Sequence, residues 1–138
     1  MVKISKALGT MAAAMALPIL AQGTAYADIP FGQTMNGNAT YYNDAGYGAC
    51  GTQVNAATEM LVAVPAAYWT TANPNNDPLC NNVSVEVTYN GRTIKVPVKD
   101  KCPSCSSTHI DLSYPAFAQL ADPNLGNIPL TWKFVHTS

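Results

Sequence analysis

The segment Lys99-Asp-Lys-Cys-Pro-Ser-Cys-Ser-Ser-Thr-His-Ile-Asp-Leu-Ser-Tyr-Pro-Ala-Phe-Ala-Gln-Leu-Ala121 decides the fold. It contains a closely spaced cysteine pair, then the element His109-Ile-Asp-Leu112, and then a signal for a short helix. Ser113 is a residue type that caps helix N-termini, and Pro115 is tolerated in a first helical turn. The order of a cysteine loop, a strand and a capped helix therefore forms the framework on which the rest of the chain must be placed.

A β-hairpin is predicted immediately before this segment. Apolar and polar residues alternate on both sides of Asn90-Gly91, a pair that supplies the positive φ angles of a type I′ turn. Shorter strand-like runs occur at 38–42, 60–64 and 130–134, and 66–69 has the length of one helical turn. We therefore expect a mainly β domain, a small closed barrel of about six strands with one or two short helices.

Four cysteines suggest that this barrel is stapled by disulfides. An even number of cysteines in a small exported chain indicates a disulfide framework, with three connectivities open here. We favour a local Cys102–Cys105 bridge and a longer Cys50–Cys80 bridge. Cys-Pro-Ser-Cys also has the spacing of a thioredoxin-type redox motif or of half a zinc site. The redox motif, however, requires a following helix, and zinc requires a second close pair. We therefore expect no metal and no cofactor.

Residues 1–27 have the pattern of a signal peptide. Lys3 and Lys6 precede the apolar run 11–20, and Ala25-Tyr-Ala27 offers a cleavage site before Asp28. The apolar run is too short to be a comfortable membrane span. The mature domain is accordingly expected at 28–138, secreted and extracellular.

The charge of the mature chain excludes some classes of partner. Of the seven Lys and Arg residues two lie in the leader, against eight Asp and Glu, so the mature net charge is near −3. A mildly acidic surface without a basic cluster is a poor ligand for nucleic acid and gains no attraction to anionic lipids. We expect a monomer that binds neither nucleic acid nor membrane.

The element His109-Ile-Asp-Leu112 is similar to the His-x-Asp-Leu motif of expansins and barrel endoglucanases, in which the Asp acts on a glycan. Ordinary glycoside hydrolysis needs two carboxylates, and Asp44 is the candidate partner of Asp111. The alternative is structural: Asp111 caps backbone amides beside the Ser113 helix, and His109 fills a groove. Lytic relatives carry extra acidic and His residues where this chain has 60–67, which argues against lytic activity.

The order of a strand, a cysteine loop, the Asp-Leu element and a capped helix resembles the second half of a double-psi β-barrel. This is the fold of expansins, barwin-type lectins and rare-lipoprotein-A-type proteins. A longer resemblance covers nearly the whole mature chain and is to the papain inhibitors of streptomycetes. It rests on Thr40–Thr52, Pro65–Cys80, Val83–Val98 and Thr131–Val135. The resemblance implies a secreted, non-catalytic inhibitor of papain-like cysteine proteases. It also implies a transglutaminase substrate, with Gln33 and Gln53 as candidate acyl donors.

We expect an inhibitor of this kind to present rigid loops to the cleft of the protease. The candidates are the two loops that adjoin Cys50 and Cys80, because a bridge between these cysteines would hold the loops side by side. The expected protease-binding residues are Gly46, Tyr47, Gly48, Pro74, Asn75 and Asn76. The alternative function is an expansin-like module that binds cell-wall polysaccharide through Asp44, His109, Asp111 and exposed aromatic residues.

Overall fold

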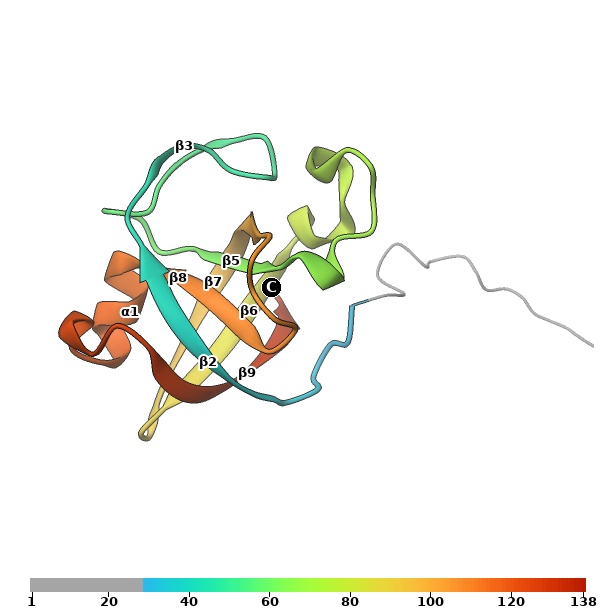
Figure 1. Ribbon diagram of the computed structural model, residues 1–138. Coiled ribbons are helices and arrows are strands. Elements are labelled where there is room, and N and C mark those ends of the chain that lie inside the picture. Colours follow the sequence, from blue (N-terminus) through green and yellow to red (C-terminus); the bar gives the residue numbers. More distant parts are fainter. Residues whose placement is uncertain (1–28) are drawn as a thin grey trace, which may run out of the picture.

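The computed structural model describes residues 29–138, so the predicted signal peptide lies outside the described residues. Six strands close into a barrel in the order β2-β8-β5-β7-β6-β9 (Figure 1). Their bounds are β2 Met35–Tyr42, β5 Val62–Pro65, β6 Val83–Tyr89, β7 Arg92–Cys102, β8 His109–Ser113 and β9 Ile128–His136. A separate two-stranded sheet consists of β3 (Ala45–Tyr47) and β4 (Gln53–Asn55). The predicted six-stranded barrel is confirmed.

Two parallel strand pairs interrupt an otherwise antiparallel barrel. β2 pairs with β8 in parallel, and β5 pairs with β7 in parallel. The β6–β7 hairpin turns at Asn90 (φ 50°) and Gly91 (φ 83°), as the Asn-Gly pair predicted. Along β7 the register with β5 shifts, because Val62 pairs with Val98 whereas Ala63 pairs with Asp100. Lys99 is therefore the extra residue of a β-bulge.

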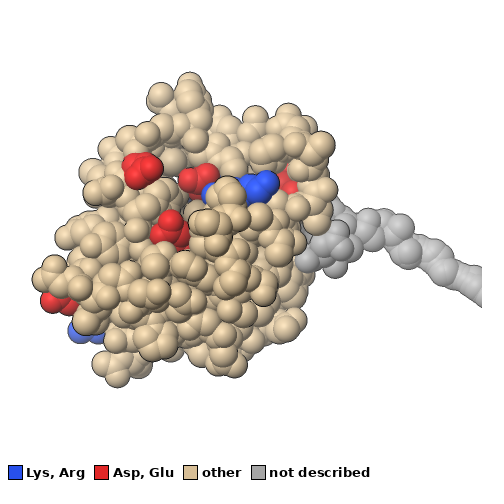
Figure 2. All heavy atoms as spheres, in the orientation of Figure 1, with Lys and Arg blue, Asp and Glu red and all other residues tan. Residues whose placement is uncertain are grey.

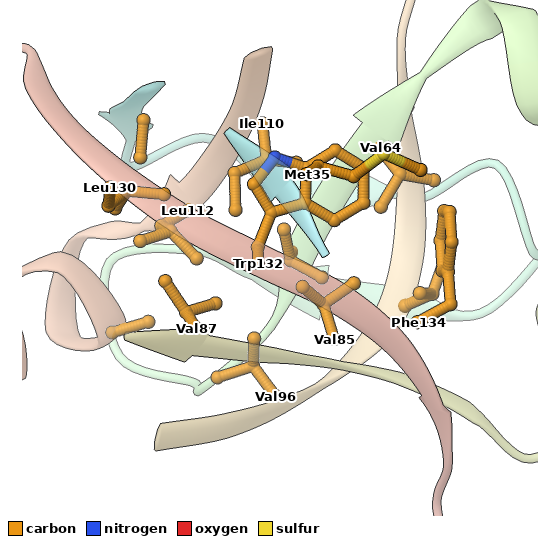
Figure 3. Packing of buried hydrophobic residues seen from close by; sticks show 14 of the residues in the cluster. Met35, Val64, Val85, Val87, Val96, Ile110, Leu112, Leu130, Trp132 and Phe134 are labelled. Atoms are coloured by element: carbon orange, nitrogen blue, oxygen red, sulfur yellow. The ribbon is translucent and has the colours of Figure 1, made fainter. Parts of the chain in front are cut away.

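The interior of the barrel is filled by aliphatic side chains around two aromatic ones, Trp132 and Phe134 (Figure 3). The two rings meet edge to face, with centroids 5.2 Å apart. The Trp132 indole Nε1–H donates to the carbonyl oxygen of Thr108 at 2.9 Å, which satisfies its polar group. The same carbonyl lies so close to Gly37 that a Cβ there would stand 1.8 Å from it. Position 37 therefore admits only glycine without a backbone shift.

The single α-helix of residues 29–138 is α1 (Tyr114–Leu120), which buries Ala116, Phe117 and Leu120 against the barrel. Its position was predicted, but the prediction that Ser113 caps it is wrong. The Ser113 side chain makes no capping bond, and its Oγ accepts instead from the backbone N–H of Leu61 at 3.1 Å. Ser113 is fully buried, so this bond pairs a polar atom that would otherwise be costly to bury.

The favoured disulfide pairing is confirmed, with bridges Cys50–Cys80 and Cys102–Cys105. The first closes a loop with a sequence separation of 30 residues and the second a separation of 3. In the chain-entropy model these loops stabilise the fold by about 3–4 and about 2 kcal/mol, respectively. The alternative of a zinc site is wrong for these cysteines, since none of the four is free. Within residues 29–138 no helix has the length and apolar character of a membrane span.

Candidate functional site

Two loop segments rise from the same end of the barrel, which we call the mouth (Figure 1). The first arm, residues 43–56, contains β3 and β4. The second arm, residues 66–80, contains three 3₁₀ turns, Ala66–Tyr68, Pro74–Asn76 and Pro78–Cys80. The first of these turns follows the predicted position at 66–69. The residues predicted to contact a protease all lie on these two arms.

The first arm exposes Tyr47 at the end of β3. Its relative exposure of 76% is the highest among the large hydrophobic side chains of residues 29–138. Gly46 is also exposed and has a φ of 146°, a backbone conformation that favours glycine. Gly48 is buried, and a Cβ there would lie 2.5 Å from the carbonyl oxygen of Lys99. Gly46 and Tyr47 therefore present a surface, whereas Gly48 fastens the arm to the barrel.

Asp100, which follows the β7 bulge, holds the first arm in place. Its carboxylate accepts from the backbone N–H of Ala49 at 3.0 Å and from its neighbour Lys101 at 2.9 Å. The Tyr42 hydroxyl donates to the same carboxylate at 3.0 Å. The backbone N–H of Cys50 donates to the Lys99 carbonyl at 3.4 Å. Asp100 therefore fastens the first arm at Ala49 to strand β7.

The second arm is organised by the buried carboxylate of Asp77, which is 3% exposed. One oxygen accepts from the backbone N–H groups of Thr70 (2.8 Å) and Thr71 (3.0 Å) and from the Thr71 hydroxyl (3.1 Å). The other accepts from the N–H of Leu79 at 3.0 Å, which caps the last 3₁₀ turn. This role of Asp77 was not predicted, although an Asp directly before Pro78 is a recognisable capping signal.

The two arms lie side by side, as the Cys50–Cys80 bridge led us to expect. A Cβ at Gly51 of the first arm would stand 2.8 Å from the amide group of Asn75 of the second. Gly51 has a φ of 85°, so glycine suits the position on both counts. Asn75 and Asn76 are exposed beside this contact, and Pro74 is half-buried.

A second polar cluster lies in the mouth, across the parallel pair of β2 and β8. Thr40 is paired with Asp111 in the register, and its hydroxyl donates to Asp111 Oδ1 at 3.1 Å. The same hydroxyl oxygen lies 2.8 Å from His109 Nε2. Because the hydroxyl has one hydrogen, Nε2–H of His109 is the donor of that second bond. The structural alternative predicted that Asp111 caps backbone amides, but its carboxylate accepts from the Thr40 side chain instead.

Burial and neighbouring charge shape the electrostatics of the mouth. Burial raises the pKa of Asp111, the Thr40 hydroxyl and His109 lower it, and the charges of Asp44 and Asp100 add to the rise. Burial and then Asp100 raise the pKa of Tyr42 far above its ordinary value, so the phenol stays protonated and remains a donor. Acidic side chains gather around a hollow at this end of the molecule, with basic ones beside them (Figure 2).

The hollow under the first arm has a volume of about 200 Å³ and is lined by Tyr42, Asp44, Tyr47 and Asp100, among others. Asp44 is exposed at its rim, and its charge reaches Asp111, so the structure brings the two predicted carboxylates into one region. Among residues 29–138 no three acidic, His or Cys side chains are grouped closely enough to hold a metal ion.

Most of the aromatic residues considered for ligand stacking have structural roles. Tyr68 packs edge to face on Phe134 with centroids 5.1 Å apart, and its hydroxyl donates to the Ser107 carbonyl at 2.7 Å. Tyr41 packs on Phe117 and Tyr114 at 4.9 and 5.4 Å. The His136 ring stacks on Phe31 with centroids 4.0 Å apart. Tyr47 is thus the aromatic residue that the mouth presents to a partner.

Comparisons with known proteins place this arrangement among its relatives. A family model described as lytic transglycolase matches residues 34–132. The papain inhibitor of Streptomyces mobaraensis is 67% identical over 117 residues, 84% of this chain and 82% of that protein. The solved structure of a Streptomyces papain inhibitor matches with a TM-score of 0.77 at 66% identity, over 78% of this chain and 99% of that one.

A more distant likeness is to an expansin of Clavibacter michiganensis, a mutant of which was solved in complex with cellohexaose. The TM-score is 0.61 and the identity 32%, over 75% of this chain. The matched part is 51% of the expansin chain, so this protein spans about half of that relative. The papain inhibitor, in contrast, is matched over most of its length.

The first prediction concerns Asp77. Asp77→Ala removes the acceptor of three N–H groups of the second arm, of which that of Leu79 is buried, and we expect a loss of about 2–4 kcal/mol in the free energy of unfolding. Asp122→Ala is the matched control, because exposed Asp122 caps the 3₁₀ turn Pro123–Leu125 through one bond to Asn124 N–H (2.9 Å). The control should lose about 1 kcal/mol or less. Urea unfolding with intact disulfides measures both, and equal losses would contradict the assigned role of Asp77.

The second prediction concerns pH. The folded-state pKa of Asp111 is raised, so the folded protein holds this proton more tightly than the unfolded chain does. Ionised Asp111 therefore destabilises the fold at neutral pH, and the penalty disappears as pH falls below about 4, the ordinary pKa of Asp. Asp111→Asn keeps an oxygen for Thr40, so its melting temperature should equal or exceed that of the wild type at pH 7. The advantage should shrink towards pH 3. The measurement is the difference in melting temperature between variant and wild type at pH 7 and at pH 3. A difference that favours the variant more at pH 3 than at pH 7 would refute the prediction.

Proposed function

The chain belongs to the double-psi β-barrel family and is a close relative of the Streptomyces papain inhibitor, and from this premise we propose that it inhibits papain-like cysteine proteases. The homology supports a protease-inhibitor role and a protein that is not an enzyme. The observation that carries the proposed mode of binding is the pair of arms joined by Cys50–Cys80, with Tyr47 exposed at their outer edge.

Rigidity is what makes such arms suitable for inhibition. A flexible loop loses conformational entropy when it binds, and pre-organisation removes most of that cost. Here the first arm is held by Asp100, the second by Asp77, and the two are joined by the disulfide. Exposed Tyr side chains are frequent hot spots because they bury a large area with few rotatable bonds. We infer that Tyr47, Gly46, Asn75 and Asn76 contact the protease and that Gly48 and Pro74 support them.

The proposed setting is extracellular and follows from the predicted signal peptide. A reducing compartment would favour reduction of both disulfides, whereas secreted domains of this size commonly depend on disulfides. Gln33 and Gln53, the candidate transglutaminase acyl donors, are both exposed, as such a reaction requires. Gln53 is on β4 of the first arm, so modification there would place a bulky group next to the proposed protease contact.

The third prediction tests the binding surface. We expect Tyr47→Ala to raise the inhibition constant for papain by about 10–100-fold, the effect of losing a hot-spot side chain. Asn75→Ala should raise it less. Leu125→Ala is the matched control, since Leu125 is 57% exposed but lies beyond helix α1, away from the mouth. Titration of the oxidised protein against papain with a fluorogenic substrate measures all three. Unchanged inhibition by both arm variants would refute the assignment of the surface, and absence of inhibition by the wild type would refute the function.

Glycan binding is a second candidate, favoured by the Asp111–Thr40–His109 cluster and by the expansin relative that was solved with cellohexaose. In this case the Asp111 carboxylate, whose pKa is raised by burial, would accept hydrogen bonds from sugar hydroxyls at the mouth. The hydrolytic variant of this idea, with Asp44 and Asp111 as a catalytic pair, does not agree with the non-catalytic close relative.

The fourth prediction separates the two candidates. If glycan binding is a function of this chain, the protein should be retained on cellulose, chitin or peptidoglycan. Asp111→Asn should then reduce retention severalfold through loss of charge-assisted hydrogen bonds, whereas Leu125→Ala should not. Pull-down with each insoluble polymer measures this. Flow-through of the wild type on all three would dispose of glycan binding and leave the inhibitor function untouched.

A further inference from the structure

The motif Cys102-Pro-Ser-Cys105 has no part in the function described above, yet it lies between the two arms. Cys102 ends β7 and pairs with Pro65, the residue from which the second arm departs. On the same strand, Lys99 and Asp100 hold the first arm through Cys50 and Ala49. In Figure 1 the turn after β7 rises in the mouth between the arms. A protease that is gripped by both arms would therefore face this turn.

The turn is also open to attack at one of its two sulfur atoms. Pro103, Ser104, Ser106 and Ser107 are exposed and Cys105 is partly exposed, whereas Cys102 is 7% exposed. The backbone N–H of Cys105 makes one long bond to the Cys102 carbonyl, at 3.4 Å. The Ser104 hydroxyl lies 3.9 Å from Cys102 Sγ, where it can donate to a sulfur that acquires negative charge. Cys105 is thus the more exposed residue of the pair, which favours Cys105 as the attacked cysteine and Cys102 as the leaving one.

We propose that the Cys102–Cys105 disulfide is a thiol-exchange site that captures the catalytic thiolate of the bound protease as a mixed disulfide. This inference rests on the proposed inhibitor function. The protease thiolate attacks Cys105 Sγ, a new S–S bond forms, and the Cys102–Cys105 bond breaks. The bonding electron pair goes to Cys102 Sγ, which leaves as a thiolate and takes a proton from water. The inhibitor disulfide is itself the oxidant, so no other reagent is consumed.

Cys50–Cys80 is a poorer target for the same thiolate. In the chain-entropy model the loss of Cys50–Cys80, which closes a sequence separation of 30 residues, costs more stability than the loss of Cys102–Cys105, which closes a separation of 3. Cys80 Sγ lies 3.4 Å from the Pro74 carbonyl and Cys50 Sγ 3.9 Å from that of Val98, so backbone oxygens cover both sulfurs on one side. A negatively charged thiolate that approaches from that side would be repelled by these carbonyl oxygens. Exchange should accordingly be selective for the turn.

The experiment mixes the oxidised protein with papain that has been activated and then freed of reductant. After an acid quench, which stops exchange by protonating thiolates, intact-mass and peptide analysis under non-reducing conditions detects and locates a covalent adduct. We expect a one-to-one adduct at Cys105 that dithiothreitol reverses. Papain with a carbamidomethylated catalytic cysteine is the control and should give none. Absence of the adduct with active, inhibited papain, or an adduct at Cys50 or Cys80, would overturn the proposal.

A matched variant separates exchange from binding. Cys102→Ser/Cys105→Ser removes the disulfide, so we expect inhibition to persist but to reverse completely on dilution, with no adduct. Glutathione provides a probe that does not depend on the protease, and exchange at Cys102–Cys105 should be about tenfold or more faster than at Cys50–Cys80. Equal rates at the two bridges would overturn the proposal even if papain were not inhibited. Inhibition without an adduct would overturn it while leaving the inhibitor function intact.

Discussion

The β-bulge at Lys99 is the constraint on which the mouth of the barrel depends. By inserting one residue into β7, it frees the Lys99 carbonyl from the ladder with β5 and makes it available to the N–H of Cys50. It also sets the register at which Asp100 pairs with Ala63 and reaches Ala49 with its side chain. Without the extra residue, the side chains beyond it would point to the opposite face. The first arm, the Asp100 anchor and the cysteine turn that follows all take their positions from this local irregularity.

The arms show how a small β-domain can hold long loops rigid without burying them in a core. Each arm is fixed by one carboxylate. Asp100 accepts from the N–H of Ala49 in the first arm, and Asp77 accepts from three N–H groups of the second. A single side chain with four acceptor sites replaces backbone pairing that an isolated loop lacks. The Cys50–Cys80 bridge then joins two segments that are already ordered. Rigidity here therefore arises from local polar contacts, and the disulfide adds the relation between the arms.

The features that were predicted from the sequence depend on residues close together in the chain. The features that were missed depend on contacts between residues far apart in the chain. The Asn90-Gly91 hairpin, the helix after Ser113 and the close Cys102–Cys105 pair follow from local patterns, so they could be recognised from residue types and spacing alone. The Cys50–Cys80 pairing was the favoured one of three open connectivities, because its partners are 30 residues apart. The bond of Ser113 to Leu61 joins residues 52 positions apart, and the burial of Gly48 depends on the carbonyl of Lys99. No local pattern contains these partners. The role of Asp77 was available locally, as a cap before a proline, but its two bonds to the amides of Thr70 and Thr71 were not.

The dimensions of the mouth favour a protein partner over a polysaccharide. The hollow bounded by Tyr42, Asp44 and Asp100 has about 200 Å³, below the roughly 300–1,000 Å³ typical of small-molecule sites. Another hollow, of about 280 Å³, adjoins the first arm at Ala45, Gly46 and Gln53. The hollows of about 490 and 450 Å³ are both lined by Tyr89 and Asn90 of the β6–β7 hairpin and by none of these carboxylates. A sugar chain needs an extended open groove, whereas here a disulfide brings the two arms together beside the carboxylates. Projecting, mutually braced arms are better suited to entering a cleft than to forming one, and a protease cleft is the complementary shape.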